Sequence, residues 1–205
     1  MATTLLYLVR HAEQHHPAMG DDTDTGLSGL GEQQAHELGK RLASVPFGEV
    51  RHSPLRRAAD TARILAGYLP GVPVSPSELL RDRTPVPSED QAGDVPARFW
   101  PFLDAVAPHE RDRGGTYLDT AVSQLAVTGP DDRCELLVTH NFVIGWFVRH
   151  ALDAPAWRWM GLNQFNCALT IIQIRTDLPP MLITFNDVGH LPLDLRGRSP
   201  VALLS

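Results

Sequence analysis

A hydrophobic segment that ends in an arginine and a histidine constrains this chain more than any other feature. Residues 5–9 are apolar and rich in strand-forming side chains, and Arg10 and His11 follow at once. The arrangement returns at residues 136–139, where a second hydrophobic segment leads into His140. Open α/β folds bind their ligands at the carboxyl ends of the strands. The two segments therefore predict that two histidines and an arginine meet at one edge of a sheet.

The rest of the chain alternates between helix-like and strand-like segments. Apolar residues recur at helical spacing over residues 28–43, 55–68, 116–127 and 142–152, the third helix ending at Gly129-Pro130. Further strands are expected at residues 50–54, 168–175 and 181–186. Ser28 is the expected N-cap of the first helix. This alternation predicts an α/β fold, a three-layer sandwich whose mostly parallel central sheet carries helices on both faces.

A length of 205 residues fits one domain, residues 1–205, better than two. Residues 70–115 differ from the remainder because they are rich in proline, and residues 84–90 cannot form a regular helix. This stretch is too long for a plain connection. We expect it to be an insertion that covers the functional site.

Composition excludes several classes of protein. The net charge of −6 argues against nucleic-acid binding, and no apolar stretch approaches the 18 residues of a membrane span. Five apolar residues before Arg10 are too few for a signal peptide. Cys134 and Cys167 are too few for a disulfide framework, so a reducing cytoplasm is the expected location.

Four ordered segments carry a resemblance to a known family. They are Leu8-Val9-Arg10-His11-Ala12-Glu13, Leu27-Ser28-x-x-Gly31-x-x-Gln34-Ala35, Ser53-Pro54-Leu55-Arg56-Arg57-Ala58-x-x-Thr61-Ala62 and Leu137-Val138-Thr139-His140. In this order the chain resembles the histidine phosphatase (phosphoglycerate-mutase-like) superfamily from residue 4 to about residue 190. The resemblance implies a phosphoglycerate-mutase-like fold and a phosphatase that needs neither metal nor organic cofactor.

The same residues suit phosphoryl transfer on chemical grounds. A phosphomonoester at neutral pH is nearly dianionic, so catalysis depends mostly on positioning and electrostatics. A neutral imidazole can attack phosphorus, which makes His11 the expected nucleophile. Arg10 and Arg57 would hold the phosphate oxygens bidentately, and His140, kept protonated by the anion, would stabilise developing charge. The family motif selects Arg57, whereas Arg56 is expected to face solvent.

The proton for the leaving group requires a carboxyl group. The family usually supplies a glutamate shortly after the second arginine-bearing helix, and the best-aligned acid here is Asp82. Aspartate is one methylene shorter, and Arg81 and Arg83 on either side are expected to lower its pKa and make it a poorer acid. Glu78 and Glu89 are the alternatives.

Shorter segments favour one branch of the superfamily. Residues 80–85, 139–144, 161–163 and 186–192 look most like the mutase-like serine/threonine protein phosphatases of mitochondria. This resemblance implies that Asn141 helps to form the substrate pocket. The location of that branch is not carried over to this chain.

Two alternative readings of the sequence concern metals. His15 and His16 could join His11 around a metal, but they lie in a predicted loop without further ligands at suitable spacing. The acidic run at residues 21–24 lacks the glycine and glutamate of a calcium loop. We therefore expect no metal site.

The aromatic residues allow two interpretations. Phe99, Trp100 and Phe102 in the proline-rich stretch either line the mouth of the substrate pocket or, as we favour, pack in the core. Three others are assigned to the core, namely Trp146, Phe147 and Trp157.

The sequence thus predicts hydrolysis of phosphomonoesters through a phosphohistidine on His11. A phosphoglycerate-type mutase is the first alternative, disfavoured because the middle of the chain lacks the mutase pattern. A phosphate-binding module without turnover is the second, because Asp82 stands where glutamate is usual. The expected partner is a small phosphorylated substrate or a phosphoprotein, with neither nucleic acid nor membrane. A homodimer is possible through the apolar residues 201–204.

Overall fold

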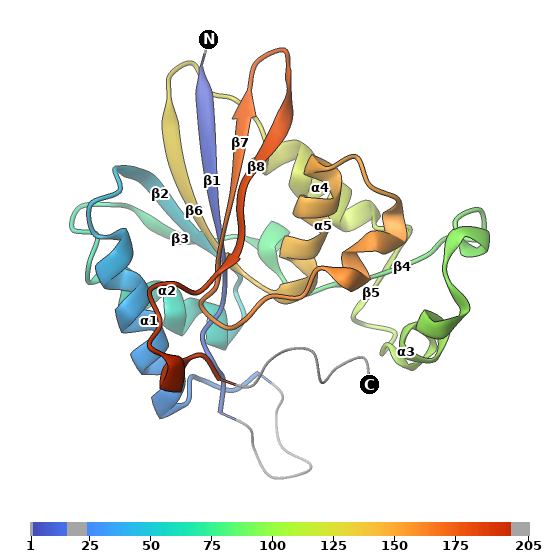
Figure 1. Ribbon diagram of the computed structural model, residues 1–205, viewed down its shortest axis with the longest axis horizontal. Coiled ribbons are helices and arrows are strands. Elements are labelled where there is room, and N and C mark those ends of the chain that lie inside the picture. The colour runs from blue at the N-terminus through green and yellow to red at the C-terminus, as the bar shows by residue number, and fades with distance from the viewer. Residues whose placement is uncertain (1, 16–23, 198–205) are drawn as a thin grey trace.

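Six strands form the central sheet in the computed structural model, which describes residues 2–15 and 24–197 (Figure 1). Their order is β3 (Val74–Pro76), β2 (Phe47–His52), β6 (Arg133–Thr139), β1 (Thr3–Arg10), β7 (Leu169–Arg175) and β8 (Leu178–Asp187). The first four strands of this order pair in parallel. β7 runs antiparallel to both β1 and β8. The sheet is therefore mixed but mostly parallel.

Helices cover both faces of this sheet. In Figure 1, α1 (Gly29–Leu42) and α2 (Arg56–Ala66) lie on one side of the strands, and α4 (Thr116–Leu125) and α5 (Asn141–Ala151) lie on the other. This arrangement confirms the predicted α/β fold. The predicted end of the third helix was wrong: the helix stops at Leu125, because Ala126 leaves the helical region with a ψ of 57°.

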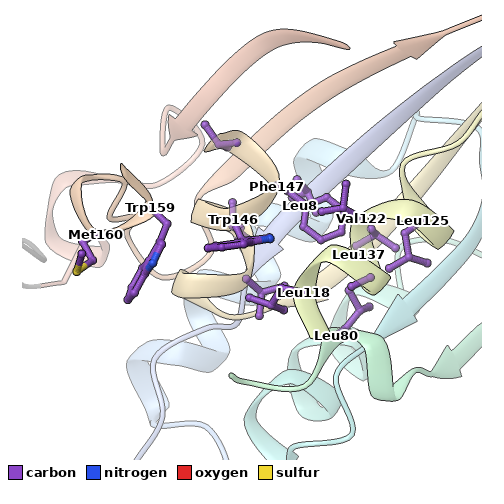
Figure 2. Close-up of a cluster of buried hydrophobic side chains, with 14 of the residues drawn as sticks. Leu8, Leu80, Leu118, Val122, Leu125, Leu137, Trp146, Phe147, Trp159 and Met160 are labelled. Atoms are coloured by element: carbon purple, nitrogen blue, oxygen red, sulfur yellow. The ribbon is translucent and has the colours of Figure 1, made fainter. Parts of the chain in front are cut away.

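Each face of the sheet has its own hydrophobic core. Leu6 and Leu8 point from β1 toward α4 and α5, whereas Val9 packs on the side of α1 and α2. Figure 2 shows the first of these cores, with Leu8 beside the large rings of the α5 residues Trp146 and Phe147. Because both faces of β1 are covered by helices, its apolar residues run continuously instead of alternating with polar ones.

One of the core assignments from the sequence was wrong. Trp146 and Phe147 are each only 2% exposed, as predicted. Trp157 is only partly buried, and Trp159 takes the core position instead, at 3% exposure. The two tryptophans lie in a short 3₁₀ helix, η4 (Ala156–Gly161), which directs the ring of Trp159 onto Phe142 with 4.8 Å between ring centroids.

The proline-rich stretch 70–115 is built from short elements. They are β3, η1 (Glu78–Leu80), β4 (Thr84–Val86), η2 (Ala92–Asp94), η3 (Ala97–Phe99), α3 (Trp100–Ala105) and β5 (Arg111–Arg113). β3 belongs to the main sheet. β4 pairs in parallel with β5, and the chain between these two strands extends away from the main sheet in Figure 1. The remaining short helix is η5 (Leu193–Leu195). Within residues 2–15 and 24–197, no helix has both the length and the hydrophobicity needed to cross a membrane.

The segment that follows the first strand is held against the start of α1. The Ser28 hydroxyl accepts a hydrogen bond from the Gly31 N–H at 3.0 Å, which confirms Ser28 as the N-cap, and donates one to the Glu13 carboxylate at 2.9 Å. A Cβ atom on Gly31 would lie 2.0 Å from the Glu13 carbonyl oxygen. The close approach of two backbones therefore requires glycine at this position.

Substitution of this glycine tests the packing. We expect Gly31→Ala to destabilise the protein by about 1–3 kcal/mol, because the clash is with backbone that cannot rotate away. Gly29→Ala in the same helical turn is the matched control, since nothing lies within 4 Å of its Cβ position. That variant should equal the wild type or exceed it by up to about 1 kcal/mol. Urea denaturation measures both, and equal stability of the two variants would contradict the proposed clash.

Candidate active site

Three neighbouring strands end together and deliver three polar side chains to one edge of the sheet. β1 leads into His11, β6 into His140 and β2 into Ser53. Two backbone hydrogen bonds of 2.9 Å hold these strand ends in register, from the His11 N–H to the Thr139 carbonyl and from the Ser53 N–H to the Val138 carbonyl. The rings of His11 and His140 lie 5.2 Å apart between centroids. The structure therefore brings the two predicted histidines together.

The contacts of His11 define which ring nitrogen carries the proton. Nδ1 lies 2.8 Å from the Ala12 carbonyl oxygen, which can only accept a hydrogen bond. Nε2 accepts a hydrogen bond from Nε of Arg57 at 3.2 Å, and a guanidinium can only donate. The proton is therefore assigned to Nδ1, and the lone pair of Nε2 faces the arginine.

The surroundings of His11 keep its ring neutral. Its side chain is buried, and this burial lowers its pKa well below the usual value, with further lowering by His140, Arg10 and Arg57. A neutral imidazole is the form that can attack phosphorus, and the lone pair on Nε2 of His11 is held by the hydrogen bond from Arg57 until a substrate binds.

Arg57 points into the site, and its neighbour does not. The Arg57 side chain is 11% exposed, and its Nη2 donates to Oδ2 of Asp82 at 2.8 Å. Its Nη1 lies 3.5 Å from Oδ1 of Asp24. The side chain of Arg56 is 70% exposed, as expected for a surface residue. Thr61 fixes this geometry, because its hydroxyl donates to the Arg57 carbonyl at 2.7 Å and accepts from the Ala12 N–H at 3.0 Å.

The Arg10 side chain is anchored by one hydrogen bond, and N–H groups of its guanidinium are left to bind a ligand. Its Nη1 donates to the carbonyl oxygen of Gln164, while its buried Nε has no hydrogen-bond partner among the described residues. The Asn141 amide oxygen accepts from the Gln164 N–H at 2.8 Å, and its amide nitrogen donates to Asn163 at 2.7 Å. Asn141 thus supports the segment that holds Arg10. Direct contact of Asn141 with the substrate, as the resemblance implied, stays a prediction.

His140 is buried more deeply than His11, at 1% exposure. Its Nε2 lies 2.7 Å from the Ser53 hydroxyl, and its Nδ1 lies 3.4 Å from Oδ2 of Asp82. Burial lowers its pKa well below the usual value, and Arg57, Arg10 and Arg81 lower it further. These surroundings oppose a positive charge on the ring, in contrast to the protonated form expected from the sequence.

The sequence-based expectation for the pKa of Asp82 was wrong in sign. Although 36% of its side-chain surface is exposed, burial of the carboxyl group raises its pKa, and this outweighs the lowering by Arg57, Arg10 and Arg83. Arg81 does not contact Asp82, because it forms a bidentate pair with Glu78 at 2.7 and 3.1 Å. Asp82 is therefore better suited to carry a proton than we expected from the adjacent residues Arg81 and Arg83.

The two alternative acids lie elsewhere. The Glu78 side chain is 68% exposed, and its hydrogen bonds to Arg81 lower its pKa, which favours a carboxylate at the surface. Glu89 is exposed in the loop after β4. The geometry favours Asp82 over both, because Asp82 is the acid that contacts Arg57 and approaches His140.

A cleft of about 460 Å³ opens onto Arg57 and Asp82. The residues of its wall are polar or charged except for one leucine: Gln14, Asp24, Leu55, Arg57, Arg81, Asp82, Arg83, His109 and Glu110. The proline-rich stretch thus contributes its residues 81–83 and 109–110 to the wall. Phe99, Trp100 and Phe102 are not part of this wall; Phe99 is buried in the core, and Trp100 packs against it.

The described residues offer no metal site. Among residues 2–15 and 24–197, no group of three or more His, Cys, Asp or Glu side chains could hold a metal ion. His15 is exposed, and Asp24 accepts hydrogen bonds from the backbone N–H of Arg56 at 2.9 and 3.1 Å. His16 and residues 21–23, which the sequence raised as alternative ligands, lie outside the described residues.

Three residues of the site had no role predicted from the sequence, although two of them, Ser53 and Thr61, stand in the family motif. Ser53 contacts His140, Thr61 links Arg57 to the backbone after His11, and the Asn166 amide donates to the His11 carbonyl at 2.9 Å. The position of Ser53 could have been predicted, because Ser53 follows the end of a strand just as the two histidines do. No sequence pattern indicated a role for Asn166, because it lies in an irregular segment far along the chain.

Comparison with known proteins agrees with this geometry. A sequence profile of the histidine phosphatase superfamily (branch 1) matches residues 6–187. The mitochondrial serine/threonine-protein phosphatase PGAM5 of Mus musculus is 31% identical over 204 residues, covering 97% of this chain and 67% of the relative. Its counterpart Pgam5 from Caenorhabditis briggsae is 31% identical over 194 residues, covering 93% and 65%. The chain thus spans about two thirds of the length of these curated relatives.

A solved structure supports the fold. The mycobacterial glucosyl-3-phosphoglycerate phosphatase superposes with a TM-score of 0.67 at 22% identity, covering 90% of this chain and 99% of that one. The predicted phosphoglycerate-mutase-like fold is confirmed by this likeness.

The buried neutral histidines make stability depend on pH. Folding lowers the pKa of His11 below 6.5, so below that pH the unfolded chain binds a proton that the folded chain does not. Its stabilising contribution is present above pH 6.5 and is lost as the pH falls, at up to about 1.4 kcal/mol per pH unit. We expect His11→Asn, which can still donate to the Ala12 carbonyl, to reduce the slope of the wild type, while His140 and His190, whose pKa values burial also lowers, retain the rest. Urea denaturation between pH 7.5 and 5 measures it.

The matched control for this measurement is His150→Asn on the exposed surface of α5. It should leave the slope unchanged. A wild-type slope retained in His11→Asn would show that His11 does not enter the fold as a neutral ring.

Proposed function

Because this chain belongs to the histidine phosphatase superfamily (branch 1), we propose that it hydrolyses phosphomonoesters through a phosphohistidine on His11. A phosphatase of this family is a hydrolase that does not need a metal. The residues that carry the reaction are the predicted set His11, Arg10, Arg57, His140 and Asp82.

In the first half-reaction, Nε2 of His11 attacks phosphorus and the bond to the leaving oxygen breaks. Asp82 gives its proton to that oxygen, so an alcohol leaves and a carboxylate remains. Arg10 and Arg57 hold the phosphoryl oxygens, whose charge matches their fixed positive charges. The bond between Nδ1 and the Ala12 carbonyl oxygen holds the ring in the attacking orientation.

In the second half-reaction, the Asp82 carboxylate takes a proton from water and hydroxide attacks the phosphohistidine. The nitrogen–phosphorus bond breaks, its electron pair returns to Nε2, and inorganic phosphate leaves. Asp82 is protonated again, which restores the starting state. One carboxyl group serves as acid and then as base, and the raised pKa of Asp82 supports the first of these roles.

The observation that most strongly supports this proposal is the pair of hydrogen bonds on the ring of His11. The Ala12 carbonyl accepts a hydrogen bond from Nδ1, and Arg57 donates one to Nε2. The attacking atom and a guanidinium that would bind the phosphate are thereby placed side by side. Removal of one such preorganised donor typically costs about 10²–10³ in rate.

The substrates of this chain are phosphorylated, and we propose that they include phosphoserine and phosphothreonine in proteins. The PGAM5 relatives are named serine/threonine-protein phosphatases and match nearly the whole of this chain. The charged wall of the cleft is compatible with a polar peptide. We also propose a cytoplasmic location, because Cys134 and Cys167 are both unpaired thiols.

Loss of the nucleophile gives the most direct test. We expect His11→Ala to lose at least about 10³-fold in the turnover of an aryl phosphate, because no other group can form the covalent intermediate. Brief reaction with ³²P-labelled substrate should label the wild type with an alkali-stable, acid-labile phosphate, and should not label the variant. His150→Ala on the exposed surface is the control.

Two outcomes would contradict the proposal. Phosphate binding without turnover in the wild type would indicate a non-catalytic module. Interconversion of phosphoglycerates without release of phosphate would indicate a mutase.

Removal of the acid should act selectively. Asp82→Asn cannot protonate a leaving group, so we expect a loss of about 10²-fold or more with alkyl phosphates and a much smaller one with aryl phosphates, which leave unaided. Steady-state kinetics with β-glycerophosphate and p-nitrophenyl phosphate measure both. Glu78→Gln is the matched control at an exposed acid. Equal losses on the two substrates, or selective loss in Glu78→Gln, would assign the acid elsewhere.

The substrate class has its own test. We expect kcat/KM for phosphothreonine peptides to exceed that for glycerol phosphate by about tenfold or more, because contacts remote from the phosphate contribute binding energy. Release of inorganic phosphate measures both, with His11→Ala as the background. Preference for the small ester would favour a metabolite phosphatase.

A further inference from the structure

The Ser53 hydroxyl is placed to decide how the second histidine carries its proton. Ser53 is fully buried at the end of β2, and its oxygen lies 2.7 Å from Nε2 of His140. The same oxygen accepts a hydrogen bond from the Leu55 N–H at 3.3 Å. A hydroxyl has one proton to donate. Among the described residues, Nε2 of His140 is the only hydrogen-bond acceptor that the Ser53 proton has.

The two neutral forms of His140 differ sharply in this setting. With the proton on Nε2, the ring would donate to Ser53, whose own proton would then be buried without an acceptor. Its bare Nδ1 would face Oδ2 of Asp82, an oxygen that already accepts from Arg57. With the proton on Nδ1, Ser53 donates to Nε2, and the Nδ1–H faces Oδ2 of Asp82 at 3.4 Å, without a hydrogen bond in the free site. An unsatisfied buried polar group costs about 1–3 kcal/mol, so the need of the Ser53 proton for an acceptor favours the second form.

On these contacts, and on the basis of the proposed phosphatase function, we propose that Ser53 is a positioning residue that holds His140 as the neutral tautomer protonated on Nδ1. In this form His140 stabilises the transferring phosphoryl group by donating a hydrogen bond and adds no positive charge. Nδ1 is buried and has no hydrogen-bond partner among the described residues, as expected for a donor that serves a ligand.

The charges around His140 agree with this role. Arg57, Arg10 and Arg81 all oppose protonation of the ring, and its burial does so more strongly. The two guanidinium groups of Arg10 and Arg57 already supply two positive charges for a phosphate dianion. A neutral donor completes the binding site without a third cation in contact with them.

A spectroscopic measurement reads the tautomer directly. In long-range ¹H–¹⁵N spectra of the histidine-labelled protein, we expect the His140 nitrogens at pH 7.5 to show a protonated Nδ1 and a bare Nε2. His140→Asn identifies the signals by their loss. Ser53→Ala should shift His140 toward the Nε2-protonated form and leave the His11 tautomer unchanged, because the Ala12 carbonyl fixes the latter. Ser75→Ala, a part-buried serine bonded to Glu49, is the matched control and should change neither ring.

Kinetics give a second, independent reading. The amide nitrogen of asparagine, like Nδ1, is two bonds from Cβ, whereas that of glutamine reaches the position of Nε2. We therefore expect His140→Asn to keep kcat for an aryl phosphate within about tenfold of the wild type, and His140→Gln to lose about 10²–10³-fold. Ser53→Ala should lower kcat by about tenfold with little change in KM, since the ring remains but its tautomer is no longer fixed.

Each result decides the proposal. A wild-type His140 protonated on Nε2, or doubly protonated at pH 7.5, would overturn it, as would a more active His140→Gln than His140→Asn. The wild-type spectrum needs no variant to fold and no turnover. If Nδ1 proves protonated while no phosphohistidine forms on His11, the assignment of the tautomer stands and the proposed function alone fails.

Discussion

The parallel pairing of β1 with β6 is the interaction on which the rest of the site depends. It aligns Arg10 with Thr139, so the next residue of each strand, His11 and His140, leaves the sheet at the same level. A hydrogen bond from the His11 N–H to the Thr139 carbonyl fixes this level at the last point of the ladder. A slip by one residue would turn one ring to the opposite face of the sheet. The cores on both faces prevent such a slip, because β1 is buried on each side.

Burial then determines the chemistry that these rings can perform. Both histidines lose their charge because desolvation and nearby arginines oppose it, whereas the arginines keep theirs. Arg57 unites the site, since one guanidinium contacts His11, Asp82 and Asp24. The site thus combines a neutral nucleophile and a partly exposed acid with fixed positive charges. The fixed positive charges attract an incoming phosphate dianion. The His11 ring stays neutral and keeps the lone pair with which it attacks phosphorus.

Much of the fold and of the site could be predicted from the sequence. The features that could not be predicted all depend on contacts formed only in the folded chain. The hydrophobic strands and their terminal histidines are local patterns, so the fold and the meeting of His11 with His140 followed from them. The sign of the pKa shift at Asp82 did not, because it depends on depth and on where the neighbouring side chains turn. Arg81 turns away to Glu78, which adjacency in sequence does not reveal. The support that Asn141 gives to the segment behind Arg10 likewise depends on residues that meet only in the folded chain.

The backbone before Asp82 is anchored to the strand that leads into the second histidine. The Thr139 hydroxyl donates to the Leu80 carbonyl at 2.8 Å, so the strand that delivers His140 also holds the segment two residues before Asp82. Oδ2 of Asp82 lies 3.4 Å from Nδ1 of His140 and accepts a hydrogen bond from Arg57. Because Thr139 and His140 are adjacent, any shift of that strand would move the acid and the second histidine together.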